Sequence, residues 1–162
     1  MKLIVAVDKE WNIGNNGNLL FRLPLDMKFF RTQTTDKIVV MGRKTLESFP
    51  NSKPLKNRVN IVLSRNKDYT VEGAQVVSDT AELQELLKEY NSDDVYVIGG
   101  ESVYGLLMPM CDTAIITHVN AVAENADKKF PELSEKEWKL SKIIDETVDN
   151  GYNIKWCEYK RI

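Results

Sequence analysis

The sequence has few of the residues that build metal centres and disulfide frameworks. Its 162 residues include one histidine, His118, and two cysteines, Cys111 and Cys157. Zinc sites need several cysteine or histidine ligands at short spacings, and disulfide frameworks need more cysteines than this. We therefore expect no metal site, a structural role for the lone histidine, and the reducing cytoplasm as the location.

Long apolar runs and a strong charge imbalance are missing as well. The N-terminal apolar run, Leu3 to Val7, is too short for a signal-peptide core or a membrane span. A net charge of −2 argues against general binding to nucleic acids or anionic membranes. No repeat, low-complexity segment or flexible linker divides the chain, so we expect a single domain covering residues 1–162.

Strand and helix patterns alternate along most of the chain. Continuous apolar runs predict strands buried on both faces at 3–7, 37–41, 59–63, 74–77, 95–98 and 113–120. Apolar residues at helical spacing predict helices at about 24–34, 44–49, 79–90 and 101–109. Asn150-Gly151 predicts a hairpin between 138–146 and 152–161. The expected fold is a three-layer α/β sandwich with about four helices, a mostly parallel sheet of about eight strands, and a C-terminal antiparallel hairpin.

Three predicted strands end in segments suited to phosphate groups. The segments are Gly42-Arg43-Lys44-Thr45, Ser64-Arg65 and Gly99-Gly100-Glu101-Ser102. Bases at a helix start favour an anion there, and paired glycines let the backbone approach a pyrophosphate. Each segment alone is at least as consistent with a solvated surface turn, and the first two alone favour it. Together, at one edge of a parallel sheet, they suit a dinucleotide with an extra phosphate, such as NADPH.

Asp26 lies in the first turn of the helix that begins at Pro24, and its role has two interpretations. Acids are common at helix starts, where they cap free N–H groups. Alternatively, Phe29 and Phe30 place aromatic surface on the same side, and the carboxylate binds a flat, amidine-bearing heterocycle through two hydrogen bonds. The preceding loop, residues 13–22, starts with glycine and asparagine and ends apolar, as a cover over a pocket does.

Several motifs, in order along essentially the whole chain, resemble those of the dihydrofolate reductase family. They are Ile13-Gly14, Leu23-Pro24-x-Asp26-x-x-x-Phe30, Val40 to Ser48, Pro54 to Ser64, Val97 to Tyr104, Thr117-His118 and Asp127-x-x-Phe130-Pro131. The resemblance implies NADPH-dependent reduction of 7,8-dihydrofolate to 5,6,7,8-tetrahydrofolate. Hydride goes to C6 of the pterin and a proton to N5, and the product supplies one-carbon metabolism and thymidylate synthesis.

The resemblance also implies roles for individual residues. Asp26 is expected to act in catalysis by binding the 2-amino group and N3 of the pterin, supported by Thr117, while Arg58 takes the α-carboxylate. The remaining expected substrate contacts are Ile4, Val5, Ala6, Met27, Phe30, Phe49, Leu55, Ile98 and Tyr104. The expected cofactor contacts are Ala6, Ile13, Gly14, Asn18, Leu19, Gly42, Arg43, Lys44, Thr45, Leu63, Ser64, Arg65, Ile98, Gly99, Gly100, Glu101, Ser102, Val103 and Tyr104. The family further implies a cis peptide at Gly99-Gly100 and a monomer.

The chain departs from the family pattern at Leu20-Phe21, where the family usually has Pro-Trp. Phe21 has no indole N–H, and Leu20 lacks the fixed φ of proline. We expect the loop to differ most from that of relatives. Two alternatives stay open: a related pterin or flavin-precursor reductase, and a folate- or nucleotide-binding protein without turnover. Asp26 together with Arg58 favours folate as the substrate.

Overall fold

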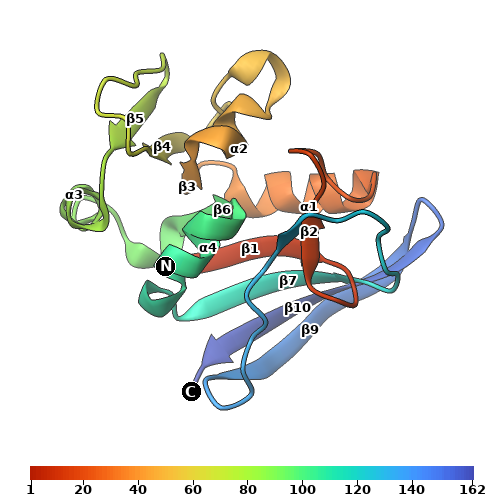
Figure 1. Ribbon diagram of the computed structural model, residues 1–162. Helices are drawn as coiled ribbons and strands as arrows, with labels where there is room; N and C mark the ends of the chain where they lie inside the picture. The colour runs from red at the N-terminus through yellow and green to blue at the C-terminus, as the bar shows by residue number, and fades with distance from the viewer.

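The computed structural model describes all residues, 1–162, and is built on one eight-stranded sheet (Figure 1). Six neighbouring strands are parallel, and β10 and β9 continue the sheet as antiparallel edge strands. Their order across the sheet is β5 (Ala74–Val77), β4 (Val59–Leu63), β3 (Ile38–Gly42), β6 (Val95–Gly99), β1 (Lys2–Val7), β7 (Thr113–Val119), β10 (Tyr152–Arg161) and β9 (Trp138–Asp149). The predicted mostly parallel sheet with its C-terminal hairpin is confirmed.

Four helices cover the two faces of the sheet and complete the predicted three layers. On one face, α1 (Pro24–Thr34) packs Phe29 and Phe30 on Ile4, and α2 (Arg43–Glu47) adds its buried Leu46. On the other face, Leu83 of α3 (Thr80–Leu87) and Leu107 of α4 (Glu101–Leu107) join the main core. Three short 3₁₀ turns lie at Pro50–Ser52, Ser92–Asp94 and Met108–Met110. No helix is both long enough and apolar enough to cross a membrane.

A second, two-stranded ribbon was not predicted. It pairs β2 (Asn12–Gly14) with β8 (Lys128–Lys129), and strands this short carry too few residues to show a pattern. The ribbon holds the start of the loop before α1: Asp127 donates its N–H to the Gly14 carbonyl at 2.9 Å and accepts the Asn16 N–H at 3.1 Å. The loop is therefore anchored where it begins and exposed farther on, with Leu19 73% exposed.

The end of the β9–β10 hairpin caps α1. No side chain of α1's own N-cap residue does so, and Oδ2 of Asp149 accepts the N–H groups of Leu25 at 2.9 Å and Asp26 at 3.1 Å. The adjacent Asn150 donates its amide to the Arg22 carbonyl at 2.9 Å. Because Asp149 is buried, the turn at the far edge of the sheet fixes the first turn of α1, where Asp26 lies.

Loss of this cap is expected to destabilise the protein. Asp149→Ala leaves two helix-start N–H groups without their acceptor and should lower the free energy of unfolding by about 1 kcal/mol. Urea denaturation followed by circular dichroism measures the change. The matched control is Asp145→Ala, which removes an exposed aspartate from the same strand. Equal midpoints for the two variants would contradict a capping role for Asp149.

Candidate active site

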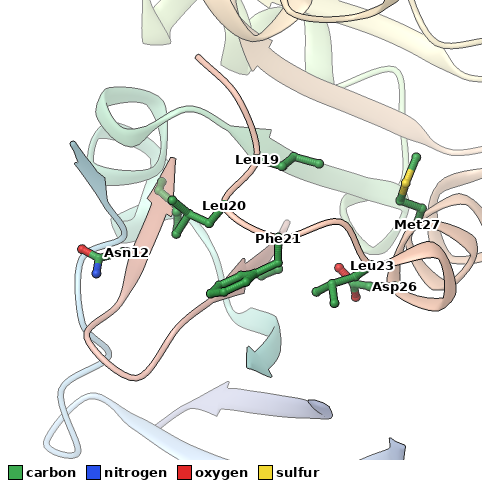
Figure 2. Close-up of a pocket in the computed structure, with 9 residues that line it drawn as sticks. Asn12, Leu19, Leu20, Phe21, Leu23, Asp26 and Met27 are labelled. Atoms are coloured by element: carbon green, nitrogen blue, oxygen red, sulfur yellow. The ribbon is translucent and has the colours of Figure 1, made fainter. Parts of the chain in front are cut away.

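A pocket opens between the start of α1, the loop before it, and the strands β1 and β2 (Figure 2). Seven of its nine lining residues are apolar, and Asp26 is its one titratable group. The lining residues are Ala6, Asn12, Ile13, Leu19, Leu20, Phe21, Leu23, Asp26 and Met27. A carboxyl group among apolar walls is the arrangement expected for binding a flat heterocycle with polar edges.

Asp26 is held by two donors on one of its oxygens. Thr117 Oγ1 donates to Oδ1 at 2.7 Å, and Trp156 Nε1 donates to the same atom at 2.8 Å. Oδ2 has no hydrogen-bond partner in the protein and is the oxygen available to a ligand in the pocket. Capping is not the function of this side chain, because Asp149 accepts the helix-start N–H groups. Of the two interpretations from the sequence, the geometry favours ligand binding.

Burial raises the pKa of Asp26, and the negative charge of Asp149 raises it further. The hydrogen bonds from Trp156 and Thr117 oppose this rise because they stabilise the carboxylate. The net direction is upward, so this carboxyl exchanges its proton nearer to neutral pH than an exposed aspartate does. A carboxyl tuned in this way suits a site that binds a protonatable ring or controls its protonation.

Trp156 is the site residue that the sequence did not reveal. The residue is buried like a core residue, and its ring stacks on Phe29 with centroids 5.0 Å apart. Its N–H nevertheless reaches Asp26. The feature that would have identified Trp156 is strand pairing. Trp156 lies directly opposite Thr117 between β10 and β7, and opposite residues project on the same face of a sheet. That register is set by tertiary contacts and could not be read from the chain.

The departure at Leu20-Phe21 falls inside this pocket. Both residues line it (Figure 2). The Phe21 ring packs edge-on against Tyr152 at the start of β10, with centroids 4.8 Å apart. Phe21 thus ties the loop to the same hairpin that caps α1. Of the other expected contacts on the loop, Leu19 lines the pocket and Asn18 is exposed beside it.

The three glycine- and arginine-containing strand ends lie next to one another, as predicted. Gly42 of β3 pairs with Leu63 of β4, and Met41 pairs with Gly99 of β6. The Gly99-Gly100 peptide is cis, as the resemblance implied. A Cβ on either glycine would lie in van der Waals contact with Thr45 Oγ1, at 3.4 Å, so side chains here would fill the space between β6 and α2. A bare backbone at this point fits close approach of a dinucleotide.

Bases surround this edge of the sheet. Arg43 opens α2, with its Nε 3.3 Å from Glu47 Oε1 and its guanidinium 5.7 Å from the Tyr69 ring centroid. Lys44 and Arg65 are exposed and form no ion pair, while Ser64 between the strands is buried. Unpaired positive charge beside a bare glycine backbone fits a phosphorylated ligand.

Arg58 carries a buried donor without an acceptor. Its Nε has no hydrogen-bond partner, and burial, with the nearby charge of Arg31, lowers the pKa of the guanidinium. Buried N–H groups are almost always paired, so this donor needs an external acceptor, and a carboxylate suits it. Phe49 and Leu55 pack together in the cluster beside α2 and supply apolar surface on this side of the molecule.

The remaining predicted residues divide between pocket and core. Ala6, Ile13 and Met27 line the pocket, and Ile98 and Phe30 pack with Ile4 beside it. Glu101 accepts the Lys129 N–H at 2.6 Å, and Ser102 is exposed at the start of α4. The side chains that lie farther into the core are Val5, Val103 and Tyr104. Tyr104 donates its hydroxyl to the Ile4 carbonyl at 2.7 Å, so it supports the wall of the site from behind.

The lone histidine and the cysteines take no part in the site. His118 Nε2 lies 2.8 Å from the Tyr159 hydroxyl, and its ring meets Trp11 edge-on at 5.7 Å. Burial raises the pKa of the Cys111 thiol to about 12 and also raises that of Cys157. Thiols of this kind are poor nucleophiles, so neither cysteine is a candidate catalytic group.

The fold and the site define a class: oxidoreductases with a glycine-rich dinucleotide edge beside a pocket with one carboxyl group. The dihydrofolate reductase family model matches residues 1–161. The chain is 32% identical to dihydrofolate reductase of Bacillus subtilis, over 99% of this chain and 94% of that one, and 36% identical to that of Schistosoma mansoni, over 98% and 95%. It also resembles the structure of dihydrofolate reductase from Enterococcus faecalis complexed with NADP(H), with a TM-score of 0.89 and 34% identity, over 99% of this chain and 95% of that one. This chain belongs to the dihydrofolate reductase family.

Proposed function

We propose that this chain reduces 7,8-dihydrofolate to 5,6,7,8-tetrahydrofolate with NADPH, and so supplies one-carbon metabolism and thymidylate synthesis. The observation that carries this proposal is the carboxyl of Asp26. It is the one titratable group of the pocket, Oδ1 is held by Thr117 and Trp156, and Oδ2 is free for a ligand. This arrangement presents one oxygen, in a fixed orientation, to a nitrogen-rich ring edge.

The substrate is held at its two ends. Asp26 binds the 2-amino group and N3 of the pterin, and the apolar walls from Ala6, Leu20 and Met27 exclude water around the ring. Arg58 binds the α-carboxylate, which supplies the missing acceptor for its buried Nε. Phe49 and Leu55 pack against the benzoyl group between these two charged contacts.

The residues at the strand ends fit the cofactor. NADPH supplies the hydride that reduces C6. Gly99 and Gly100 let the chain approach the dinucleotide closely, with Thr45 beside them. Arg43, Lys44, Ser64 and Arg65 hold the adenosine end and its 2′-phosphate, because bidentate guanidinium contacts match phosphate oxygens.

Protonation at N5 is the step that Asp26 controls. Burial raises the pKa of this carboxyl, and its negative charge beside the ring favours uptake of a proton by the bound ring. No second carboxyl lines the pocket to take over this role.

We also propose that the chain acts as one domain, as a monomer, and in the cytoplasm. The single-domain proposal is supported by the eight-stranded sheet, whose strands span residues 2–161. The net charge of −2 gives no reason to expect a nucleic-acid partner. Membership of the dihydrofolate reductase family supports the proposals of a monomer and of the cytoplasm.

The reaction can be tested directly. Mixing the protein with NADPH and dihydrofolate should reduce the absorbance of the nicotinamide band, because NADPH is oxidised as the pterin is reduced. The loss should need dihydrofolate and be blocked by a diaminopyrimidine, which mimics the pterin edge that Asp26 binds. Ligand binding without absorbance loss would identify a folate-binding protein without turnover, and turnover of other pterins or flavin precursors alone would identify a related reductase.

A further inference from the structure

Two different kinds of donor converge on the same oxygen of Asp26. The Thr117 hydroxyl comes from β7 and the Trp156 indole N–H from β10, at 2.7 and 2.8 Å. A hydroxyl can donate or accept, whereas an indole N–H can only donate. Oδ1 therefore always faces at least one fixed donor, and a proton on the carboxyl has no acceptor in the direction of Trp156.

The indole of Trp156 is locked in place by packing. The residue is 8% exposed, and its ring stacks on Phe29 of α1 at an interplanar angle of 27°. It belongs to a cluster with Leu23, Val119 and Ile154. The indole cannot rotate away from Asp26 without disturbing contacts to both α1 and the edge of the sheet. A donor held by its own packing orients its partner well.

The surroundings of Asp26 contain one other charge. Asp149 of β9 approaches through its bonds to the Leu25 and Asp26 N–H groups, and its negative charge raises the pKa of Asp26. The other neighbouring elements present uncharged groups: Ala6 from β1, Thr117 from β7 and Trp156 from β10. Trp156 and Asp149 therefore act on this carboxyl in opposite directions.

We propose that Trp156 is a positioning residue for the reaction: its N–H holds Oδ1 as an acceptor and so fixes the orientation in which the Asp26 carboxylate meets the substrate. The catalytic part of this inference rests on the proposed function. The hydrogen bond itself does not, and it can be tested without substrate. Trp156 touches the acid rather than the reacting atoms, so it acts through Asp26.

The first experiment follows the indole ¹H–¹⁵N resonances of the ligand-free protein as a function of pH. The chain has three tryptophans, and the Trp156 resonance should shift in one transition that disappears in Asp26→Asn. The Trp11 ring lies against His118, so any pH-dependent shift of the Trp11 resonance should be unchanged in that variant. A Trp156 resonance that does not titrate, or that titrates unchanged in Asp26→Asn, overturns the proposal even if no substitution of Trp156 folds.

The second experiment compares Trp156→Phe with Trp138→Phe in steady-state turnover as a function of pH. Trp138 is the matched control because it is buried in the neighbouring strand and its Nε1 has no partner to lose. The midpoint of the pH profile should move up by about one pH unit in Trp156→Phe, as expected for one lost hydrogen bond to a carboxylate. It should stay in place in Trp138→Phe.

The outcomes separate this inference from the proposed function. Superimposable profiles for the two variants overturn the positioning role, whatever their absolute rates. An upward shift in Trp156→Phe alone supports it, because a merely structural loss lowers the rate without moving the midpoint. A wild-type protein that does not reduce dihydrofolate would refute the proposed function, while the resonance titration still decides whether Trp156 holds the carboxyl.

Discussion

Asp26→Asn is expected to lower turnover at neutral pH by about 10³-fold, within the range that a positioned acid or base supplies. Asparagine keeps the size of the side chain and an oxygen that can accept from Thr117 and Trp156. It carries neither the charge that pairs with the pterin edge nor a transferable proton. The remaining rate then depends on solvent acid, so it should rise more steeply than the wild-type rate as the pH falls.

Steady-state kinetics with saturating NADPH, from about pH 5 to about pH 9, measure this effect across the ordinary titration range of carboxyl and imidazole groups. No other titratable group lines the pocket, so no neighbour can replace the lost carboxyl. A variant that stays within about tenfold of the wild type over this whole range would show that Asp26 has no catalytic role, since one positioned acid or base contributes more than that.

Stability provides the control for this variant. The pKa of Asp26 is raised in the folded state by burial, so the ionised group costs stability above its folded pKa. Below the unfolded pKa both states are protonated and the cost is absent. Asp26→Asn should therefore unfold at the same or a higher temperature than the wild type near pH 8, and the two should converge in acid. A large loss of activity without a loss of Tm separates catalysis from folding.

The second large effect concerns the cofactor. Replacing Arg43 and Arg65 together by alanine should raise the KM for NADPH by about 100-fold, as expected for two charge-assisted bonds of about 1.5 kcal/mol each. NADH lacks the 2′-phosphate, so its KM should change by no more than about threefold, the usual context-dependence of single contacts. Initial rates with each cofactor at saturating dihydrofolate measure both values.

The control for the arginine pair is the double variant Lys56→Ala and Lys67→Ala. This variant removes the same amount of positive charge from two exposed positions that flank β4 in the sequence. General electrostatic attraction of the cofactor would make the two double variants alike. Equal losses for NADPH and NADH in the arginine variant would refute the 2′-phosphate assignment.

Much of the fold was predictable because buried strands and helices have characteristic patterns of apolar residues in the sequence. Parallel strands covered on both faces, such as residues 3–7, appear as continuous apolar runs, and helices appear as apolar residues at helical spacing. Asn150-Gly151 predicted the final hairpin because both residues adopt positive φ, here 49° and 84°. The β2–β8 ribbon was not predicted because strands of two or three residues are too short to show a pattern of alternation.

The edge of the sheet that we propose binds the cofactor was partly predictable for a different reason. Arg43, Ser64 and the paired glycines each follow a predicted strand, and parallel strands end at one edge of a sheet. Their meeting therefore follows from chain order alone. The acidic pocket did not follow in this way, because the position of its carboxyl in the chain favoured a helix cap.

The sequence by itself predicted the layered sheet, the three strand ends that meet at one edge and the resemblance to the family, and it left Asp26 with two interpretations. Only the tertiary structure showed that another residue caps the helix and that Asp26 lines a pocket. Asp149, more than a hundred positions away, takes the capping role, and Trp156 reaches the carboxyl from another strand. Both contacts depend on how the closing hairpin lies against α1. That placement is set by the sum of many weak packing contacts, and such contacts leave no local pattern in the chain.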